Sequence, residues 1–226
     1  MGSSRRIRGG RISKSKAVLK VSEIFPSIQG EGRYVGTPVV FLRLSGCTRD
    51  CWFCDEKQHK KGKYLEIQKV ADKIQEFSFR TVVVTGGEPL LQKDALFELM
   101  LRLGHLRWYL ETNGDWIEEE KDFLELVGKF DYVCISPKEE EVAQRVWEFR
   151  RKFPVFRNRV DIKVVTDLYE VGMELVPYAT MLMPLSVKEE KENIGIRRRV
   201  WKFCVNNELF YSPRLQVEVW GYGSRL

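Results

Sequence analysis

Residues 39–56 read VVFLRLSGCTRDCWFCDE, an apolar run typical of a strand followed at once by a loop with three cysteines. Residues 81–89 have the same arrangement, with TVVVT directly before GGEP. Two further runs also end in polar residues, at 107–114 (RWYLETNG) and 131–138 (DYVCISPK). β-branched and aromatic residues dominate all four runs, as in buried strands. Because parallel strands end at one edge of a sheet, we expect these polar groups to meet there.

The rest of the chain continues this alternation of strands and helices. Further strand-like runs cover 18–25, 159–165, 180–185 and 214–220. Amphipathic patterns with apolar residues at helical spacing cover 66–77, 93–104, 116–128, 140–153 and 187–207. Repeated alternation predicts an α/β fold with a mainly parallel sheet. A complete eightfold barrel typically needs about 250 residues, so 226 residues favour a partial (β/α) barrel in a single domain.

The composition, 43% hydrophobic and 31% charged, is typical of a globular protein. The net charge of +6 comes from the first 20 residues, which hold seven basic side chains and no acidic one. We therefore expect a basic flexible tail at 1–17 and one folded domain at 18–226. With no apolar run near the roughly 20 residues of a membrane span and no apolar signal region after the basic start, we expect a cytoplasmic protein.

Three of the five cysteines, Cys47, Cys51 and Cys54, fall within eight residues at C-x3-C-x2-C spacing. Thiolates at such spacing can hold one face of a [4Fe–4S] cluster and leave the fourth iron open to a small molecule. A structural zinc site is the alternative, with His59 as the fourth ligand. Cys134 and Cys204 stand alone and are expected to be buried in the core.

The cysteine loop after one strand and GGEP after the next resemble the radical S-adenosylmethionine (radical SAM) superfamily. Upstream, EIFPSIQGEG at 23–32 and GTPVVFLRLSGC at 36–47 resemble the 7-carboxy-7-deazaguanine synthase family. The ETNG, SPK and QVEVWG segments support this resemblance, which runs from about Val21 to Trp220. It implies a radical SAM type of partial barrel.

The resemblance also implies an activity: conversion of 6-carboxy-5,6,7,8-tetrahydropterin to 7-carboxy-7-deazaguanine with loss of ammonia. The expected cofactors are a [4Fe–4S] cluster, S-adenosyl-L-methionine and Mg2+. The product would serve deazapurine synthesis and hence tRNA modification, without direct contact between this enzyme and nucleic acid. Flavodoxin or ferredoxin is the expected electron donor, and a homodimer is the expected assembly.

Site residues follow from the same resemblance. The expected cluster ligands are Cys47, Cys51 and Cys54. The expected S-adenosylmethionine contacts are Gly86, Gly87, Glu88, Glu111, Asn113, Ser136 and Lys138. The glycines let the backbone approach a ligand, and the Glu88 carboxylate can accept hydrogen bonds from an ammonium group. The expected substrate contacts are Gln29, Glu31, Arg43, Thr85, Gly87 and Glu218.

The sequence departs from the family pattern at two positions. Glu56 stands where the family commonly has a threonine that contacts magnesium, so we expect Glu56 to supply a hard oxygen ligand instead. Glu218 occupies the place of a substrate-binding histidine in the family, and we expect it to accept hydrogen bonds from the pterin. Two other functions stay open at this point: a glycyl-radical enzyme activase and a zinc-binding module without enzymatic activity.

Overall fold

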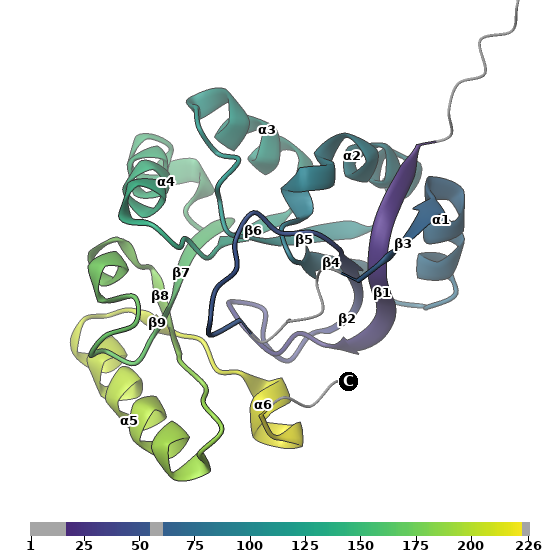
Figure 1. Ribbon diagram of the computed structural model, residues 1–226. Helices are drawn as coiled ribbons and strands as arrows, with labels where there is room; N and C mark the ends of the chain where they lie inside the picture. Colours follow the sequence, from purple (N-terminus) through teal and green to yellow (C-terminus); the bar gives the residue numbers. More distant parts are fainter. Residues whose placement is uncertain (1–16, 55–60, 223–226) are drawn as a thin grey trace, which may run out of the picture.

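The computed structural model describes residues 17–54 and 61–222. Nine strands form one curved sheet in the order β3-β1-β2-β4-β5-β6-β7-β8-β9 (Figure 1). Their bounds are β1 Val18–Ile28, β2 Pro38–Leu44, β3 Lys63–Glu66, β4 Thr81–Gly86, β5 Arg107–Thr112, β6 Tyr132–Ile135, β7 Val160–Thr166, β8 Met181–Pro184 and β9 Phe210–Tyr211.

The sheet is parallel across most of its width. Each neighbouring pair from β2 to β9 is parallel, whereas β1 runs antiparallel to both β2 and β3. Within the described chain β3 and β9 are the two outer strands of the order, so the sheet does not close. The expected α/β fold with a partial barrel is therefore confirmed.

Helices cover the outer face of the curved sheet (Figure 1). Five of them follow strands in the order of the chain, while the short α6 lies at the inner mouth of the barrel. Their bounds are α1 Ile67–Gln75, α2 Lys93–Arg102, α3 Glu120–Lys129, α4 Glu140–Lys152, α5 Glu190–Asn206 and α6 Leu215–Trp220, with 3-10 turns at Pro89–Gln92, Pro154–Phe156 and Met173–Tyr178.

The alternation of side chains along each strand separates the core from the site. One set of alternate residues, including Val82, Val84 and Leu110, packs against the helices in the main core. The other set faces the inside of the barrel. It forms a second, smaller apolar cluster of Val39, Val83, Tyr109, Tyr132 and Cys134. Further along the same inner face, polar side chains line a cavity at the carboxyl ends of the strands.

A buried ion pair fixes the loop after β1 to the sheet. Asp161, on β7, is fully buried. It accepts hydrogen bonds from Arg33 Nε at 2.8 Å and Arg33 Nη2 at 2.9 Å. Tyr132 and Thr180 donate further hydrogen bonds to it, at 2.8 and 3.0 Å. A buried carboxylate without partners is strongly destabilising, so the bonds between Arg33 and Asp161 are costly to break. Because Arg33 belongs to the loop of residues 29–36, these bonds hold that loop in place.

The predicted strand at 214–220 is wrong, because these residues form helix α6. Apolar residues at alternate positions suggested a strand with one buried face. In the structure only Val217 of these is buried, while Val219 is 66% exposed. The helix ends where Gly221 takes a φ of 84°, a conformation that favours glycine.

Other differences from the predicted elements are smaller. The edge strands β3 and β9 were not predicted, since four and two residues are too short for a clear pattern. Helix α3 begins at Glu120 rather than 116, because Glu119 and Asp122 form a capping box.

Residues 1–16 of the predicted tail lie outside the described residues, and Ala17 already packs against the core. Within residues 17–54 and 61–222, no helix is both long and apolar enough to cross a membrane.

Candidate active site

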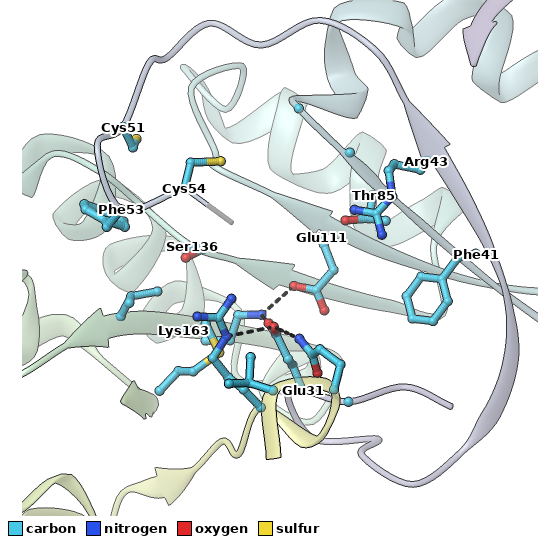
Figure 2. A pocket seen from close by; sticks show the side chains of 18 of the residues that line it. Glu31, Phe41, Arg43, Cys51, Phe53, Cys54, Thr85, Glu111, Ser136 and Lys163 are labelled. Carbon is cyan, nitrogen blue, oxygen red and sulfur yellow. Dashed lines mark hydrogen bonds and ion pairs between the residues drawn. The ribbon is translucent and has the colours of Figure 1, made fainter. Parts of the chain in front are cut away.

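A cavity of about 630 Å³ lies inside the barrel at the carboxyl ends of the strands (Figure 2). Its volume is in the range of small-molecule sites. Most of the predicted site residues line it, although they come from distant parts of the chain. These are Gln29, Glu31, Arg43, Cys47, Cys51, Cys54, Thr85, Gly86, Gly87, Glu111, Asn113, Ser136 and Lys138.

The three cysteines of the loop after β2 form one end of the cavity. Cys47, Cys51 and Cys54 are free thiols, partly exposed, and all three line it. In the parts of the chain that the structure describes, no three His, Cys, Asp or Glu side chains are grouped tightly enough for a single metal ion. A [4Fe–4S] cluster takes each thiolate on a different iron. Three partly exposed thiols from one loop, all lining one cavity, are a donor set that fits such a cluster.

Arg49 anchors the cysteine loop to the loops after β5 and β6. Its guanidinium donates to both carboxylate oxygens of Asp115, at 2.9 and 2.8 Å, and also pairs with Glu139. The neighbouring Thr48 donates to Asp115 at 2.6 Å and accepts from Asn113 Nδ2 at 2.8 Å. These bonds hold the cysteine loop over the carboxyl ends of β5 and β6.

The GGEP turn lies directly against the cysteine loop. A Cβ atom added to Gly86 would lie 2.0 Å from the carbonyl oxygen of Leu44, and one added to Gly87 would lie 1.9 Å from that of Gly46. Gly86 also has a φ of +130°. The glycines are therefore required by the close approach of two protein segments. The sequence-based prediction had explained them by the approach of the backbone to a ligand. The backbone N–H of Glu88 donates to Gly46 at 2.8 Å.

Glu88 does not line the cavity. Its side chain is fully buried, and its carboxylate accepts hydrogen bonds from Leu90 N at 2.9 Å, Thr112 Oγ1 at 2.7 Å and Asn113 N at 2.8 Å. Burial raises the pKa of Glu88 to about 7 against the opposing effect of these bonds. Its geometry gives it a structural role that joins the GGEP turn to the end of β5, while contact with an ammonium group stays a prediction.

Three predicted cofactor residues line the wall next to the cysteines. Asn113 is buried, and its Oδ1 accepts from Asp115 N at 2.9 Å. The Lys138 ammonium donates to the carbonyl oxygen of Ser136 at 2.7 Å and to its hydroxyl at 3.0 Å. Burial lowers the pKa of Lys138.

A cluster of charged side chains forms the opposite end of the cavity (Figure 2). Lys163, on β7, lies between two carboxylates: its Nζ is 2.6 Å from Glu31 Oε2 and 2.9 Å from Glu111 Oε2. The side chain of Lys163 is only 4% exposed. Gln29 contributes its Nε2, which donates to Glu111 Oε1 at 3.4 Å. The predicted substrate residues Glu31 and Gln29 thus lie together with Glu111, which was predicted for the cofactor.

Residues 214–216 complete this cluster from α6 and the position before it. Gln216 Nε2 donates to Glu31 Oε1 at 2.7 Å, and Arg214 Nε lies 3.5 Å from the same oxygen. The backbone N–H of Leu215 donates to Gly30 at 3.0 Å, which ties this segment to the loop of Glu31. Glu218 lies on the exposed face of the helix and does not line the cavity. The predicted contact of Glu218 with the pterin is therefore not supported, and Gln216 lies in the cavity instead.

The charges of the cluster fix the ionisation of Glu31. Burial alone would raise the pKa of this carboxyl, but Lys163 and Arg214 together with hydrogen bonds lower it to about 2. Burial raises the pKa of Glu111, and Lys163 opposes this. Burial would lower the pKa of Lys163, but Glu111 and Glu31 raise it well above its ordinary value. Lys163 therefore carries its charge at neutral pH.

Arg43 and Thr85 occupy the third side of the cavity, where neighbouring strands place them opposite each other. Arg43 Nε lies 2.9 Å from Glu23 Oε2, and its guanidinium lies over the ring of Phe25, 5.5 Å from the centroid. The guanidinium is thus held at the wall by one acid and one aromatic ring.

Lys163, Arg214 and Gln216 were not among the residues predicted for the site. One signal was available: the run VDIKVV holds two charged residues, Asp161 and Lys163, at alternate positions of a buried apolar strand. That spacing places both side chains on the inner face. The predicted magnesium ligand Glu56 and the alternative zinc ligand His59 lie outside the described residues.

The chain is similar to several known proteins. Residues 42–192 match the model of the radical SAM superfamily. A 7-carboxy-7-deazaguanine synthase from Hyperthermus butylicus is 33% identical, over 92% of this chain and 96% of its own. One from Aquifex aeolicus is also 33% identical, over 86% of this chain and 91% of its own. The crystal structure of QueE from Escherichia coli shares the fold, with a TM-score of 0.59 at 21% identity over 87% of this chain and 93% of that one.

Proposed function

Because the chain belongs to the radical SAM superfamily and, within it, to the 7-carboxy-7-deazaguanine synthases, we propose that the residues of its cavity catalyse the reaction of that family. The enzyme converts 6-carboxy-5,6,7,8-tetrahydropterin to 7-carboxy-7-deazaguanine with loss of ammonia, a step of deazapurine and queuosine biosynthesis. The observation that carries this proposal is one cavity with three thiols at one end and a buried charged cluster at the other. The relatives favour this function over a glycyl-radical activase or a zinc module.

The family implies a [4Fe–4S] cluster and S-adenosylmethionine as cofactors. When bound, they supply the carbon radical that removes a hydrogen atom from the substrate. Cys47, Cys51 and Cys54 would hold the cluster as thiolates, which leaves the fourth iron open. Burial raises the pKa of the Cys47 thiol, so binding of the cluster must supply the energy to deprotonate it.

The wall between β4 and β6 would hold S-adenosylmethionine. Gly86 and Gly87 bring the backbone close to the cluster loop, while Asn113 and Ser136 offer polar groups to the sugar and amino acid parts of the cofactor. Lys138 offers an ammonium group to the carboxylate of the cofactor. Glu88 contributes by fixing the backbone of Asn113 through a 2.8 Å hydrogen bond.

The charged end would bind the pterin. Glu31 and Glu111 are acceptors for the N–H groups of the ring, and Gln29 holds Glu111 in place. Arg43 can form two parallel hydrogen bonds with the carboxylate of the substrate, provided that it gives up Glu23. Thr85, opposite Arg43, would contact the ring from β4. These residues bind and orient the substrate and keep water from the reacting carbon.

Magnesium, the electron donor and the dimer are further parts of the proposal, supported by the family resemblance. We expect Glu56 to serve magnesium; in that case Glu56→Ala abolishes the response of turnover to added Mg2+, and an unchanged response removes Glu56 from the site. We expect reduced flavodoxin or ferredoxin to replace a chemical reductant in the assay. We expect light scattering of the purified enzyme to give twice the mass of the chain.

The test of the proposed function is turnover under anaerobic conditions. The iron-loaded enzyme is incubated with S-adenosylmethionine, dithionite and 6-carboxytetrahydropterin, and the products are identified by mass spectrometry. We expect 7-carboxy-7-deazaguanine, and none when any component is omitted. Cleavage of S-adenosylmethionine without a deazaguanine product would reject the substrate. Bound zinc without iron or sulfide, after anaerobic purification, would reject the enzyme class.

A further inference from the structure

The charged end of the cavity presents one N–H donor between two carboxylates. An ammonium group has three N–H donors. In the described part of the chain, Lys163 directs two of them to Glu31 and Glu111, at 2.6 and 2.9 Å. Lys163 lines the cavity, so the third donor is available to a ligand. Along one wall of the cavity, Glu31, Lys163 and Glu111 therefore form a row of acceptor, donor and acceptor.

The two carboxylates are held in position by other residues. Glu31 Oε1 accepts from Gln216 at 2.7 Å, and Glu111 Oε1 accepts from Gln29 at 3.4 Å. Both carboxylate side chains are only 17% exposed. Because a carboxylate has about four lone-pair sites, each still has capacity to accept from a ligand. Rigid, partly desolvated groups of this kind discriminate strongly between ligands that match them and ligands that do not.

We propose that this row binds the N3–H, O4, N5–H edge of a tetrahydropterin and that Lys163 determines specificity by donating to O4. The proposal rests on the proposed function and deepens it. In the reduced ring, O4 is an acceptor that lies between the N3–H and N5–H donors, which is the complement of the row. The two carboxylates accept from these two donors.

With this binding mode the cavity is selective at three positions of the ligand: N5, the substituent at C4, and N3. In a fully oxidised pterin, N5 has lost its hydrogen and is an acceptor, so it faces a carboxylate without a proton between them. In a 2,4-diaminopteridine, an amino donor replaces O4 and faces the Lys163 ammonium, and N3 has lost its hydrogen and is an acceptor that faces a carboxylate. Each mismatch leaves a buried charged group without its partner. The enzyme should therefore bind the reduced 4-oxo ring in preference to both.

The test begins with the unmodified enzyme and a panel of ligands. The iron-loaded enzyme with S-adenosylmethionine and no reductant is titrated anaerobically by calorimetry with 6-carboxytetrahydropterin, pterin-6-carboxylate and 2,4-diaminopteridine-6-carboxylate. We expect the affinity to fall roughly tenfold or more from the first ligand to the second, and again from the second to the third. The first step measures the N5–H contact, and the second measures the contacts of O4 with Lys163 and of N3–H with Glu31 together.

Two variants assign these steps to residues. Glu111→Gln offers an amide that can donate to an oxidised N5, so the preference for the tetrahydropterin over the oxidised pterin should narrow. Lys163→Met should narrow the preference for the 4-oxo over the 4-amino ring, and the part that depends on N3–H and Glu31 should remain. The matched control is Lys93→Met, which changes a half-exposed lysine that pairs with Glu125 on the surface. It should leave both preferences as they are.

Equal affinity of the unmodified enzyme for all three ligands would overturn the inference. So would a full 4-oxo preference in Lys163→Met. If Lys163→Met does not fold, the ligand panel and Glu111→Gln still decide. Turnover of 6-carboxytetrahydropterin without the expected discrimination rejects this inference alone. Absence of both turnover and tetrahydropterin binding rejects the proposed function.

Discussion

The two ends of the cavity differ in how strongly contacts between protein side chains hold their ligand-binding groups in place. At the charged end, Lys163 contacts both Glu31 and Glu111, and their geometry is fixed by residues of β5, β7, α6 and the loop after β1. At the cysteine end, three partly exposed thiols line the wall. The charged end joins two strands, a helix and a loop that is bonded to the sheet, whereas all three cysteines come from one loop.

This difference follows from what each end has to bind. An organic substrate is recognised by hydrogen bonds whose directions must exist before binding, so its site is built from elements that buried ion pairs and hydrogen bonds hold together. A cluster brings its own rigid geometry and forms strong bonds to thiolates, so a loop can close around it. We therefore expect changes at the two ends to have separable effects.

The largest effect is expected from loss of a cluster ligand. Cys51→Ser should remove bound iron and sulfide and lower turnover by more than about a hundredfold, beyond the usual cost of losing only a supporting partner. Binding of the pterin should persist, because the charged end does not depend on the cysteine loop. Iron analysis and calorimetry measure the two effects. Cys204→Ser, a matched change in the core outside the cavity, should retain the cluster. Full turnover of Cys51→Ser would contradict the assignment.

The next effect concerns the ion pair that holds the loop of Glu31. Asp161→Ala leaves Arg33 without its buried partner and should lower the free energy of unfolding by about 3–5 kcal/mol. Urea denaturation measures this loss. Binding of the pterin should weaken more than binding of S-adenosylmethionine, since Arg33 belongs to the loop that carries Glu31. Asp72→Ala, at an exposed pair with Gln68, is the control and should change stability by less than about 0.5 kcal/mol.

The ionisation of Glu31 predicts how stability depends on pH. Its pKa is about 2 in the folded protein, against 4.5 as the ordinary value. The stabilisation is therefore complete above about pH 4.5 and is lost as pH falls toward 2, by roughly 3 kcal/mol.

Urea denaturation at pH 6 and pH 3 tests whether stability falls on acidification as expected. The Glu31→Gln variant should be less stable than the unmodified protein at pH 6, and it should lose less stability on acidification. Glu98→Gln, at an exposed pair with Arg102, should follow the unmodified protein. An equal loss of stability in Glu31→Gln would show that Glu31 is not held ionised by Lys163.

A smaller effect is expected where Arg49 supports the cysteine loop. Arg49→Lys keeps the charge but loses the two parallel hydrogen bonds to Asp115. We expect roughly a tenfold loss of cluster retention during anaerobic gel filtration, as for other partners of metal ligands. Affinity for the pterin should not change. A parallel loss of both would mean that the two ends are coupled.

The smallest effect is expected at Glu218. This side chain is exposed and lies outside the cavity, so Glu218→Gln should leave the KM for the pterin within about twofold. Gln216→Leu, two residues earlier, removes the hydrogen bond to Glu31 and should raise the KM by more. The opposite order of the two effects would restore Glu218 as a substrate contact.

The sequence predicted the parallel part of the fold because β2 and β4 to β8 are apolar runs bounded by clear turns. It also predicted that the polar residues after these strands share one rim, since parallel strands end together. It did not predict α6, where alternation in LQVEVW imitates a strand and only tertiary contacts decide. It missed Lys163 because a single charged residue within an apolar strand shows its partners only once distant strands are placed side by side.

The most direct test of the two-ended cavity is a crystal structure of the anaerobic enzyme with cluster, S-adenosylmethionine and 6-carboxytetrahydropterin. We expect one cluster bound by Cys47, Cys51 and Cys54, and the O4 edge of the pterin against Glu31, Lys163 and Glu111. A single tetrahedral metal ion on the cysteines, or a pterin bound away from Lys163, would contradict it.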